Sequence, residues 1–157
     1  SRVQITGKDD MQIKKILCPT DFSQSAEKAF KYALFMATSH DAELAMLHVV
    51  DQLHGLSHYE ILAITPMDIT EKLMKKAHET LETIVDRVED SITATEAVRQ
   101  GKAWAEICEA AKEENADIIV MGSHGRTGVS HVLIGSVAET VVRHANCPVL
   151  VVRDPNI

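Results

Sequence analysis

The sequence predicts an open, doubly wound α/β domain in which helices cover both faces of a five-stranded parallel sheet. Short apolar runs alternate with stretches of helical periodicity along the chain. A helix-length segment separates each strand-like run from the next, which is typical of parallel strands joined by right-handed crossovers. The 157 residues, 45% of them hydrophobic, suffice for one buried core but not for two ordinary domains.

The first half of the chain predicts two strands, each followed by a helix. Either Ser23 or Ser25 can cap the first helix, because small and apolar residues then recur at helical spacing. The second helix begins at Thr65, with Pro66 at its first position and Asp68 as the acid of a capping box. These four elements are expected over 13–18, 26–37, 44–50 and 65–88.

The second half predicts three further strands and two helices. Gly101 ends the third strand, and Ser136 opens the last helix. The elements are expected over 91–99, 103–114, 117–121, from 136 onward, and 148–152.

The charge distribution argues against a nucleic-acid-binding protein. The formal net charge is −7, and no run of lysine or arginine occurs. Binding to a phosphate backbone therefore lacks its usual basic footprint. An anionic ligand would have to be held locally, by helix N-termini, backbone amides and one or two cationic side chains.

Several classes of site and location are disfavoured. No stretch reaches the roughly 18 to 20 apolar residues of a membrane span, and no cleavable signal opens the chain, so we expect a cytoplasmic protein. Cys18, Cys108 and Cys147 are odd in number and lack Cys-x-x-Cys spacing, which disfavours disulfides and zinc, and the first two are expected to pack in the core. His54 and His58 lack a third ligand of clear spacing and are interpreted as surface histidines, so no metal site is expected.

A glycine-containing turn after the fourth strand predicts a phosphate cradle. Gly122 and Gly125 follow the apolar run 118–121, and Gly135 directly precedes Ser136 at the head of an amphipathic stretch. A turn between a parallel strand and a helix presents backbone N–H groups to an anion, and glycines allow the anion to approach closely.

Two better-known phosphate loops do not match. Gly101 and Lys102 come closest to a Walker loop, but Ala103 stands where serine or threonine is required. The Gly-x-Gly-x-x-Gly fingerprint of dinucleotide-binding proteins is also absent.

The spacing Gly-x2-Gly-x9-Gly-Ser over 122–136 resembles the nucleotide motif of the universal stress protein family, in its ATP-binding branch. The segment 14–22, KKILCPTDF, resembles the family's first strand, and 47–51, LHVVD, resembles its second. Nearly the whole chain after Met11 can be matched in order, so the resemblance is more specific than one glycine loop.

The resemblance implies a Rossmann-like sheet with strand order 3-2-1-4-5. It also implies ATP as ligand, with Mg²⁺, and a homodimer in which the final strands meet. Residues 11–157 are then expected to form a single domain, and residues 1–10 are a leader, native or left over from cloning. An apolar edge strand of this kind normally requires covering, which supports the dimer.

The carboxyl ends of strands one and four should form the ligand crevice, because the winding reverses there. Asp21 either accepts hydrogen bonds from a ribose or serves as a turn acid that starts the first helix. Ser136 forms a capping box with Glu139, a role compatible with phosphate binding. The role of Val49, a backbone contact to adenine, rests on the resemblance alone. The predicted nucleotide-binding residues are Pro19, Thr20, Asp21, Val49, Met121, Gly122, Ser123, Gly125, Arg126, Gly135, Ser136 and Val137.

Three functions from different classes remain open. The first is an ATP-binding regulatory protein of the stress response that acts through an unknown protein partner. The second is an enzyme that hydrolyses ATP slowly or transfers phosphate; no catalytic residue is predicted, and His124 is interpreted as an ordinary loop histidine. The third is a dimeric interaction module without nucleotide binding. Apolar residues in the connector 51–64 suggest a lid or a partner-binding surface.

Overall fold

The computed structural model describes residues 11–51, 66–124 and 134–155 of the chain. Within these ranges five parallel strands form one sheet in the order β3-β2-β1-β4-β5, which confirms the predicted fold class and strand order. The strands are β1 (Lys15–Pro19), β2 (Glu43–Val50), β3 (Ala94–Gln100), β4 (Ile118–Gly122) and β5 (Val149–Val152). The helices are α1 (Gln24–His40), α3 (Pro66–Val85), α4 (Ala103–Glu113) and α5 (Ser136–His144).

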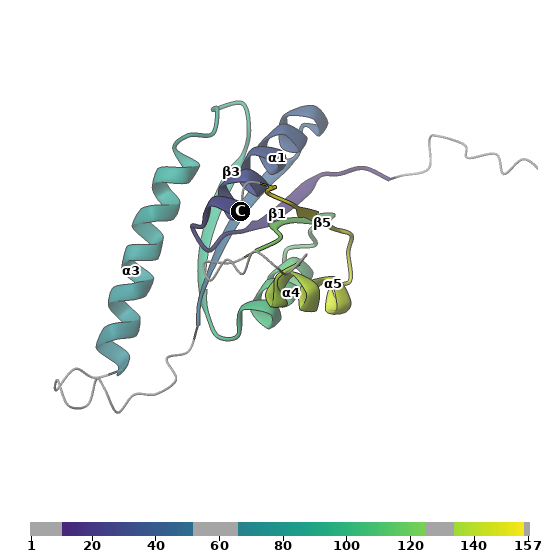
Figure 1. Cartoon of the computed structure of the whole chain (residues 1–157). Coiled ribbons are helices and arrows are strands. Elements are labelled where there is room, and N and C mark those ends of the chain that lie inside the picture. Colours follow the sequence, from purple (N-terminus) through teal and green to yellow (C-terminus); the bar gives the residue numbers. More distant parts are fainter. Residues whose placement is uncertain (1–10, 52–65, 125–133, 156–157) are drawn as a thin grey trace, which may run out of the picture.

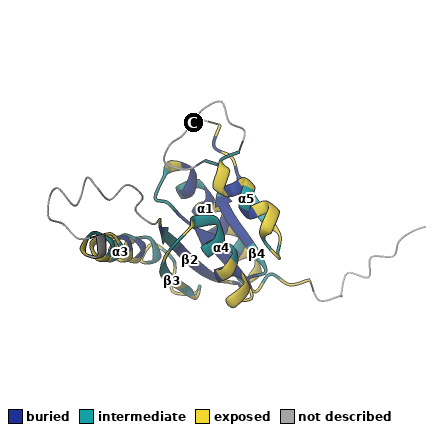
Figure 2. Cartoon of the chain, turned by 90° about the horizontal axis from the view of Figure 1, so that it is seen from below, coloured by how far each residue is buried: buried dark blue, intermediate teal, exposed yellow. Residues whose placement is uncertain are grey.

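The sheet lies between two helical layers (Figure 1). Helices α1 and α3 pack on one face, and α4 and α5 pack on the other. The buried residues concentrate in the strands and on the sheet-facing sides of the helices (Figure 2). In the described part of the chain, no helix has the length and apolarity needed to cross a membrane.

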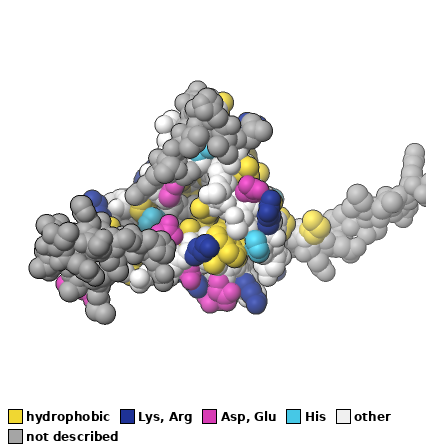
Figure 3. All heavy atoms as spheres, turned by 60° about the horizontal axis from the view of Figure 1, so that its bottom comes forward, with side chains coloured by type: hydrophobic (Ala, Val, Ile, Leu, Met, Phe, Trp, Pro, Cys, Tyr) yellow, Lys and Arg dark blue, Asp and Glu magenta, His cyan; other side chains and the backbone are white. Residues whose placement is uncertain are grey.

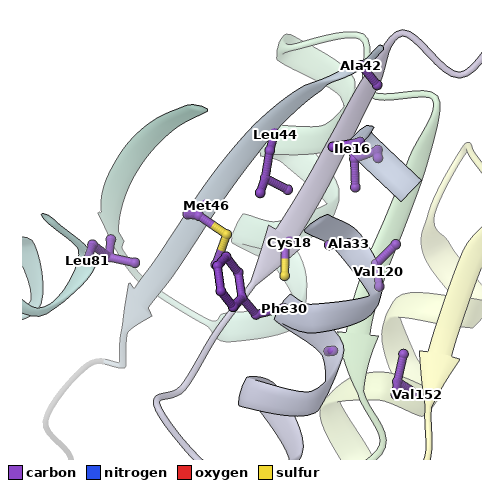
Figure 4. Packing of buried hydrophobic residues seen from close by; sticks show 12 residues of the cluster. Ile16, Cys18, Phe30, Ala33, Ala42, Leu44, Met46, Leu81, Val120 and Val152 are labelled. Atoms are coloured by element: carbon purple, nitrogen blue, oxygen red, sulfur yellow. The ribbon is translucent and has the colours of Figure 1, made fainter. Parts of the chain in front are cut away.

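Side-chain alternation along the strands produces two separate cores. In β2, Leu44 and Met46 face the α1/α3 layer, and Ala45 and Leu47 face the α4/α5 layer. Both faces are covered, so β2 reads as a nearly continuous apolar run. Figure 4 shows the first core, where side chains from β1 and β2 meet Phe30 of α1.

Cys18 lies in the first core and is fully buried, as predicted. Burial raises the pKa of the Cys18 thiol to about 12, and the nearby Glu27 carboxylate adds to the effect. Cys108 and Cys147 are partly buried against the second core, and burial raises the pKa of both thiols. All three thiols are therefore weak nucleophiles near neutral pH.

The ends of several elements differ from prediction by a few residues. Helix α1 is capped by Ser23, whose Oγ accepts a hydrogen bond from the N–H of Ala26 at 3.2 Å, whereas Ser25 lies buried inside the first turn. Helix α3 ends at Val85, not at 88, because i to i+3 bonds tighten the chain beyond that residue. The predicted cap of α3 at Thr65 lies outside the described residues.

Candidate functional site

A cleft of about 830 Å³ lies at the carboxyl edge of the sheet, where β1 and β4 run side by side. After β1 the chain continues through α1 to β2 on one side of β1, and after β4 it continues through α5 to β5 on the other side of β4. This is the point where the winding reverses, as predicted. Its volume lies within the range of small-molecule sites.

Ten of the twelve predicted nucleotide-binding residues line this one cleft. They come from the ends of three strands and from the start of α5, and they are Pro19, Thr20, Asp21, Val49, Met121, Gly122, Ser123, Gly135, Ser136 and Val137. Gly125 and Arg126 lie outside the described residues, as do His54, His58 and most of the 51–64 connector.

The turn after β1 is built from side-chain hydrogen bonds to the backbone. The N–H of Phe22 donates to Oγ1 of Thr20 at 3.1 Å, and the N–H of Ser23 donates to Oδ1 of Asp21 at 2.9 Å. Asp21 is therefore a turn acid, which is one of the two roles predicted for it. Because Asp21 also lines the cleft, its position is compatible with the second predicted role, a contact to the ligand.

The end of β4 is fastened to its neighbours. The N–H of Ser123 donates to the carbonyl of Val152 at 3.0 Å, and the N–H of His124 donates to Oγ of Ser25 at 3.3 Å. The Ser123 hydroxyl lies 2.8 Å from Nδ1 of His124. Ser123 is fully buried at the lining of the cleft, where its contact with His124 helps to hold this loop.

The predicted capping box at Ser136 is wrong. Gly135 occupies the N-cap position of α5, and Ser136 is already the first helical residue. Gly135 takes this place because its N–H donates to the carbonyl of Ser123, which anchors the helix start to the end of β4. Glu139 pairs instead with Arg143 one turn later, at 2.8 Å.

Two glycines of the motif also serve packing. A Cβ on Gly122 would lie 2.6 Å from Oγ of Ser25 and 2.8 Å from its carbonyl carbon, so α1 needs a bare backbone there. A Cβ on Gly135 would lie 2.9 Å from the carbonyl oxygen of Ser123. The glycines thus allow α1, β4 and α5 to pack closely, and the first residues of α5, whose N–H groups have no partner within the helix, line the cleft.

One wall of the cleft was not predicted from the sequence. Helix α3 contributes a stripe at helical spacing, and α4, β2 and the β1 turn contribute further residues. The missed lining residues include Leu73, Lys76, Ala77, Thr80, Ala103, Ile107, His48, Asp51 and Phe22. The periodicity of α3 is visible in the sequence, but periodicity does not reveal which face meets a ligand.

Asp51 closes the start of α4. Its Oδ1 accepts a hydrogen bond from the N–H of Ala103 at 3.3 Å, and Lys102, the N-cap residue, makes no side-chain cap bond. Gly101 has a positive φ of 146° and directly follows β3, which confirms the prediction that it ends this strand.

Few of the described residues at the site carry cationic side chains. Lys76 lines the cleft, and Lys102 lines an adjoining hollow of about 660 Å³ that shares Asp51, Ser136 and Val137 with it. On the face seen in Figure 3, lysines and arginines are interspersed with acidic side chains. Among the described residues, no group of three or more His, Cys, Asp or Glu side chains could hold a metal ion.

Comparison with known proteins places this architecture in one family. The model of the universal stress protein family matches residues 12–153. The universal stress protein MJ0577 of Methanocaldococcus jannaschii is 34% identical over 157 residues, which cover 91% of this chain and 96% of that protein. A solved structure of MJ0577 superposes with a TM-score of 0.80 and 37% identity, over 91% of this chain and 97% of that one.

Two further relatives extend the comparison. Universal stress protein G of Escherichia coli O157:H7 is 36% identical over 143 residues, covering 89% of this chain and 99% of that protein. A universal stress protein structure from Archaeoglobus fulgidus in complex with dAMP has a TM-score of 0.61 and 23% identity, over 91% and 99% of the two chains. At that identity the likeness extends to the fold alone.

Proposed function

Because this chain belongs to the universal stress protein family, we propose that it binds ATP in the cleft between β1 and β4 and regulates a protein partner according to nucleotide occupancy. One observation carries the proposal. Residues that the sequence places at three strand ends and one helix start converge on a single cleft of suitable volume. The Archaeoglobus fulgidus relative is a complex with dAMP. The support for ATP binding by this chain comes from the residues that line its own cleft.

The cleft offers different chemistry to each part of an adenine nucleotide. Val49, Met121 and Ile107 supply apolar surface for a base, and Val49 also offers backbone groups. The Asp21 carboxylate can accept hydrogen bonds from ribose hydroxyls. The exposed N–H groups at the start of α5, beside Ser136, suit phosphate oxygens because they carry partial positive charge.

Mg²⁺ would bind mainly to the phosphates of ATP. The described residues provide no three-carboxylate cage. Among the oxygen-bearing side chains that line the cleft, Asp21 and Ser136 are the two that we propose for a hard cation bound to phosphate oxygens.

We propose that hydrolysis is absent or slow. Backbone amides stabilise bound phosphate in the ground state as well as in the transition state, and such uniform binding does not raise turnover. Single-turnover assays with labelled ATP and Mg²⁺ test this point, with Ser136→Ala and His124→Ala alongside. Turnover of several per second, lost in either variant, would favour the enzyme instead.

Calorimetry with ATP and adenosine tests binding, and the variant Ser136→Asp best separates binding of the phosphates from binding of the nucleoside. An acid in the first turn favours α5, because it complements the helix dipole, but it repels phosphate. We expect Ser136→Asp to keep the wild-type melting temperature and the affinity for adenosine, and to lose at least tenfold in affinity for ATP, roughly the effect of 1.4 kcal/mol. Absence of ATP binding by the wild type at millimolar ligand would overturn the proposal.

The homodimer, the regulatory partner and the cytoplasmic location stay predictions. Apolar side chains lie at the β5 edge and on α5, notably the exposed Val142. Such an edge normally requires covering, which supports the prediction that a second copy of the chain packs against it. The single-domain boundary at residues 11–157 agrees with the family match over 12–153 and stays a proposal at its ends.

A further inference from the structure

A side chain from β2 holds the turn between β1 and α1. The N–H of Thr20 donates to the carbonyl of Leu47 at 2.8 Å, and the carbonyl of Thr20 lies 2.7 Å from Nδ1 of His48. A carbonyl can only accept, so Nδ1 of His48 carries the proton in this bond. Both backbone polar groups of Thr20, a buried residue, are thus bonded to β2.

The same histidine supports the far side of the turn. Phe22 has a positive φ of 66°, which is unfavourable for a bulky side chain and needs support from its surroundings. Its ring stacks on the His48 ring, with centroids 4.4 Å apart and an interplanar angle of 25°. This stacking holds Phe22 in the unfavourable conformation.

Asp21 lies between these two contacts. Thr20 precedes it and Phe22 follows it, and His48 touches both. We propose that His48 is a positioning residue for nucleotide binding, which fixes the backbone on either side of Asp21 so that the carboxylate meets the ligand preformed. This inference rests on the proposed function.

The expected consequence is a loss of affinity without a matching loss of fold. When the turn samples other conformations, the apparent affinity falls by the fraction of molecules in the binding-competent one. The stacking and the hydrogen bond are separable. His48→Phe keeps a ring against Phe22 and removes the donor, and His48→Asn keeps a donor near the position of Nδ1 and removes the ring.

Calorimetry with ATP and adenosine measures the effect. We expect His48→Phe to weaken both ligands by the same factor, roughly tenfold, because the lost hydrogen bond acts on a ribose contact that is independent of phosphate count. The affinity of His48→Asn for both ligands should lie between that of His48→Phe and that of the wild type. The matched control is Ser23→Ala, which removes the α1 cap next to the same turn and should lower the melting temperature without changing affinity.

A double-mutant cycle with Asp21→Ala separates positioning from direct contact. If His48 acts through Asp21, His48→Phe should cost at most about twofold in the Asp21→Ala background. A full tenfold loss in that background would mean that His48 acts other than through Asp21, either by contact with the ligand or through Thr20 or Phe22, and would overturn the inference. Unchanged affinity in His48→Phe alone, with nucleotide binding by the wild type intact, would also overturn it.

Hydrogen exchange in nucleotide-free protein tests the turn independently of any ligand. The amides of Phe22 and Ser23 should exchange at least tenfold faster in His48→Phe, with the amides of β1 unchanged. If the wild type binds no nucleotide but these amides respond, the proposed function fails and the account of the turn stands. If neither amide responds, the inference fails whatever the protein binds.

Discussion

At the scale of single residues, Asp21 combines a structural and a ligand-facing position. Its Oδ1 accepts from the N–H of Ser23, and its side chain lines the cleft. We predict that Asp21→Ala weakens ATP and adenosine alike, by about 1.5 to 3 kcal/mol, because a hydrogen bond to a charged group is lost. Asp21→Asn, which keeps an acceptor for Ser23, should lose less. A loss confined to ATP in calorimetry would instead assign Asp21 to metal-bound phosphate.

Glu27 and Arg87 form the residue-scale contact that links α1 to the end of α3, with Nη1 3.1 Å from Oε2. The hydrogen bond from Arg87 holds the pKa of Glu27 below its ordinary 4.5. A lowered carboxyl pKa contributes stability above the unfolded pKa, and that contribution is lost as pH falls through the folded value. Both side chains of the pair are partly exposed, and solvent therefore screens their attraction. We expect the pair to contribute about 0.5 kcal/mol to the stability.

Urea unfolding of the wild type and of Glu27→Gln measures this linkage. We predict a stability difference at pH 7 that is lost as the pH falls below 4.5 and through the lowered pKa of Glu27. A difference that persists unchanged at the lower pH would show that Glu27 stabilises by packing.

At the scale of elements, the contact between α1 and β4 depends on the missing side chain of Gly122. Gly122→Ala would place its methyl group 2.8 Å from the carbonyl carbon of Ser25. We predict a destabilisation of about 1 to 3 kcal/mol, because the backbone of α1 must move. Ser25→Ala should not restore stability in the double variant, since the clash with backbone remains. Wild-type stability of Gly122→Ala in thermal unfolding would contradict this packing.

The same elements show what the sequence can predict. Short apolar runs identified the five described strands, because helices cover both faces of the sheet. Helical periodicity identified the four described helices, because each buries one face against the sheet. The start of α5 at Ser136 was predicted correctly, but its N-cap at Gly135 was missed, since that cap depends on a hydrogen bond to Ser123, twelve residues away in the chain. The packing role of Gly122 and the α3 wall were missed for the same reason. They arise from contacts between distant segments, which local patterns do not encode.

At the scale of the whole molecule, the exposed edge of β5 is the predicted dimer contact. Carbonyls of Pro148 and Val152 accept hydrogen bonds from β4, so the backbone groups of Val149 and Val151 point away from the sheet. We predict that Val151→Pro, which removes an outward N–H, yields a folded monomer. Leu150→Pro, the control, should instead break the ladder within the chain and lower the melting temperature. An unchanged dimer of Val151→Pro in light scattering would refute this arrangement.

Backbone NMR titration of the wild-type protein with ATP and Mg²⁺ tests whether the cleft between β1 and β4 binds ATP. We predict saturable shifts of amides around the cleft, at 20–22, 49–51, 122–124 and 135–138, with β3 and the carboxyl-terminal half of α1 unaffected. Adenosine should shift the amides at 20–22 and 49–51 and leave the amides at the start of α5 nearly unchanged. Saturable shifts elsewhere, or none at millimolar ATP, would contradict the account.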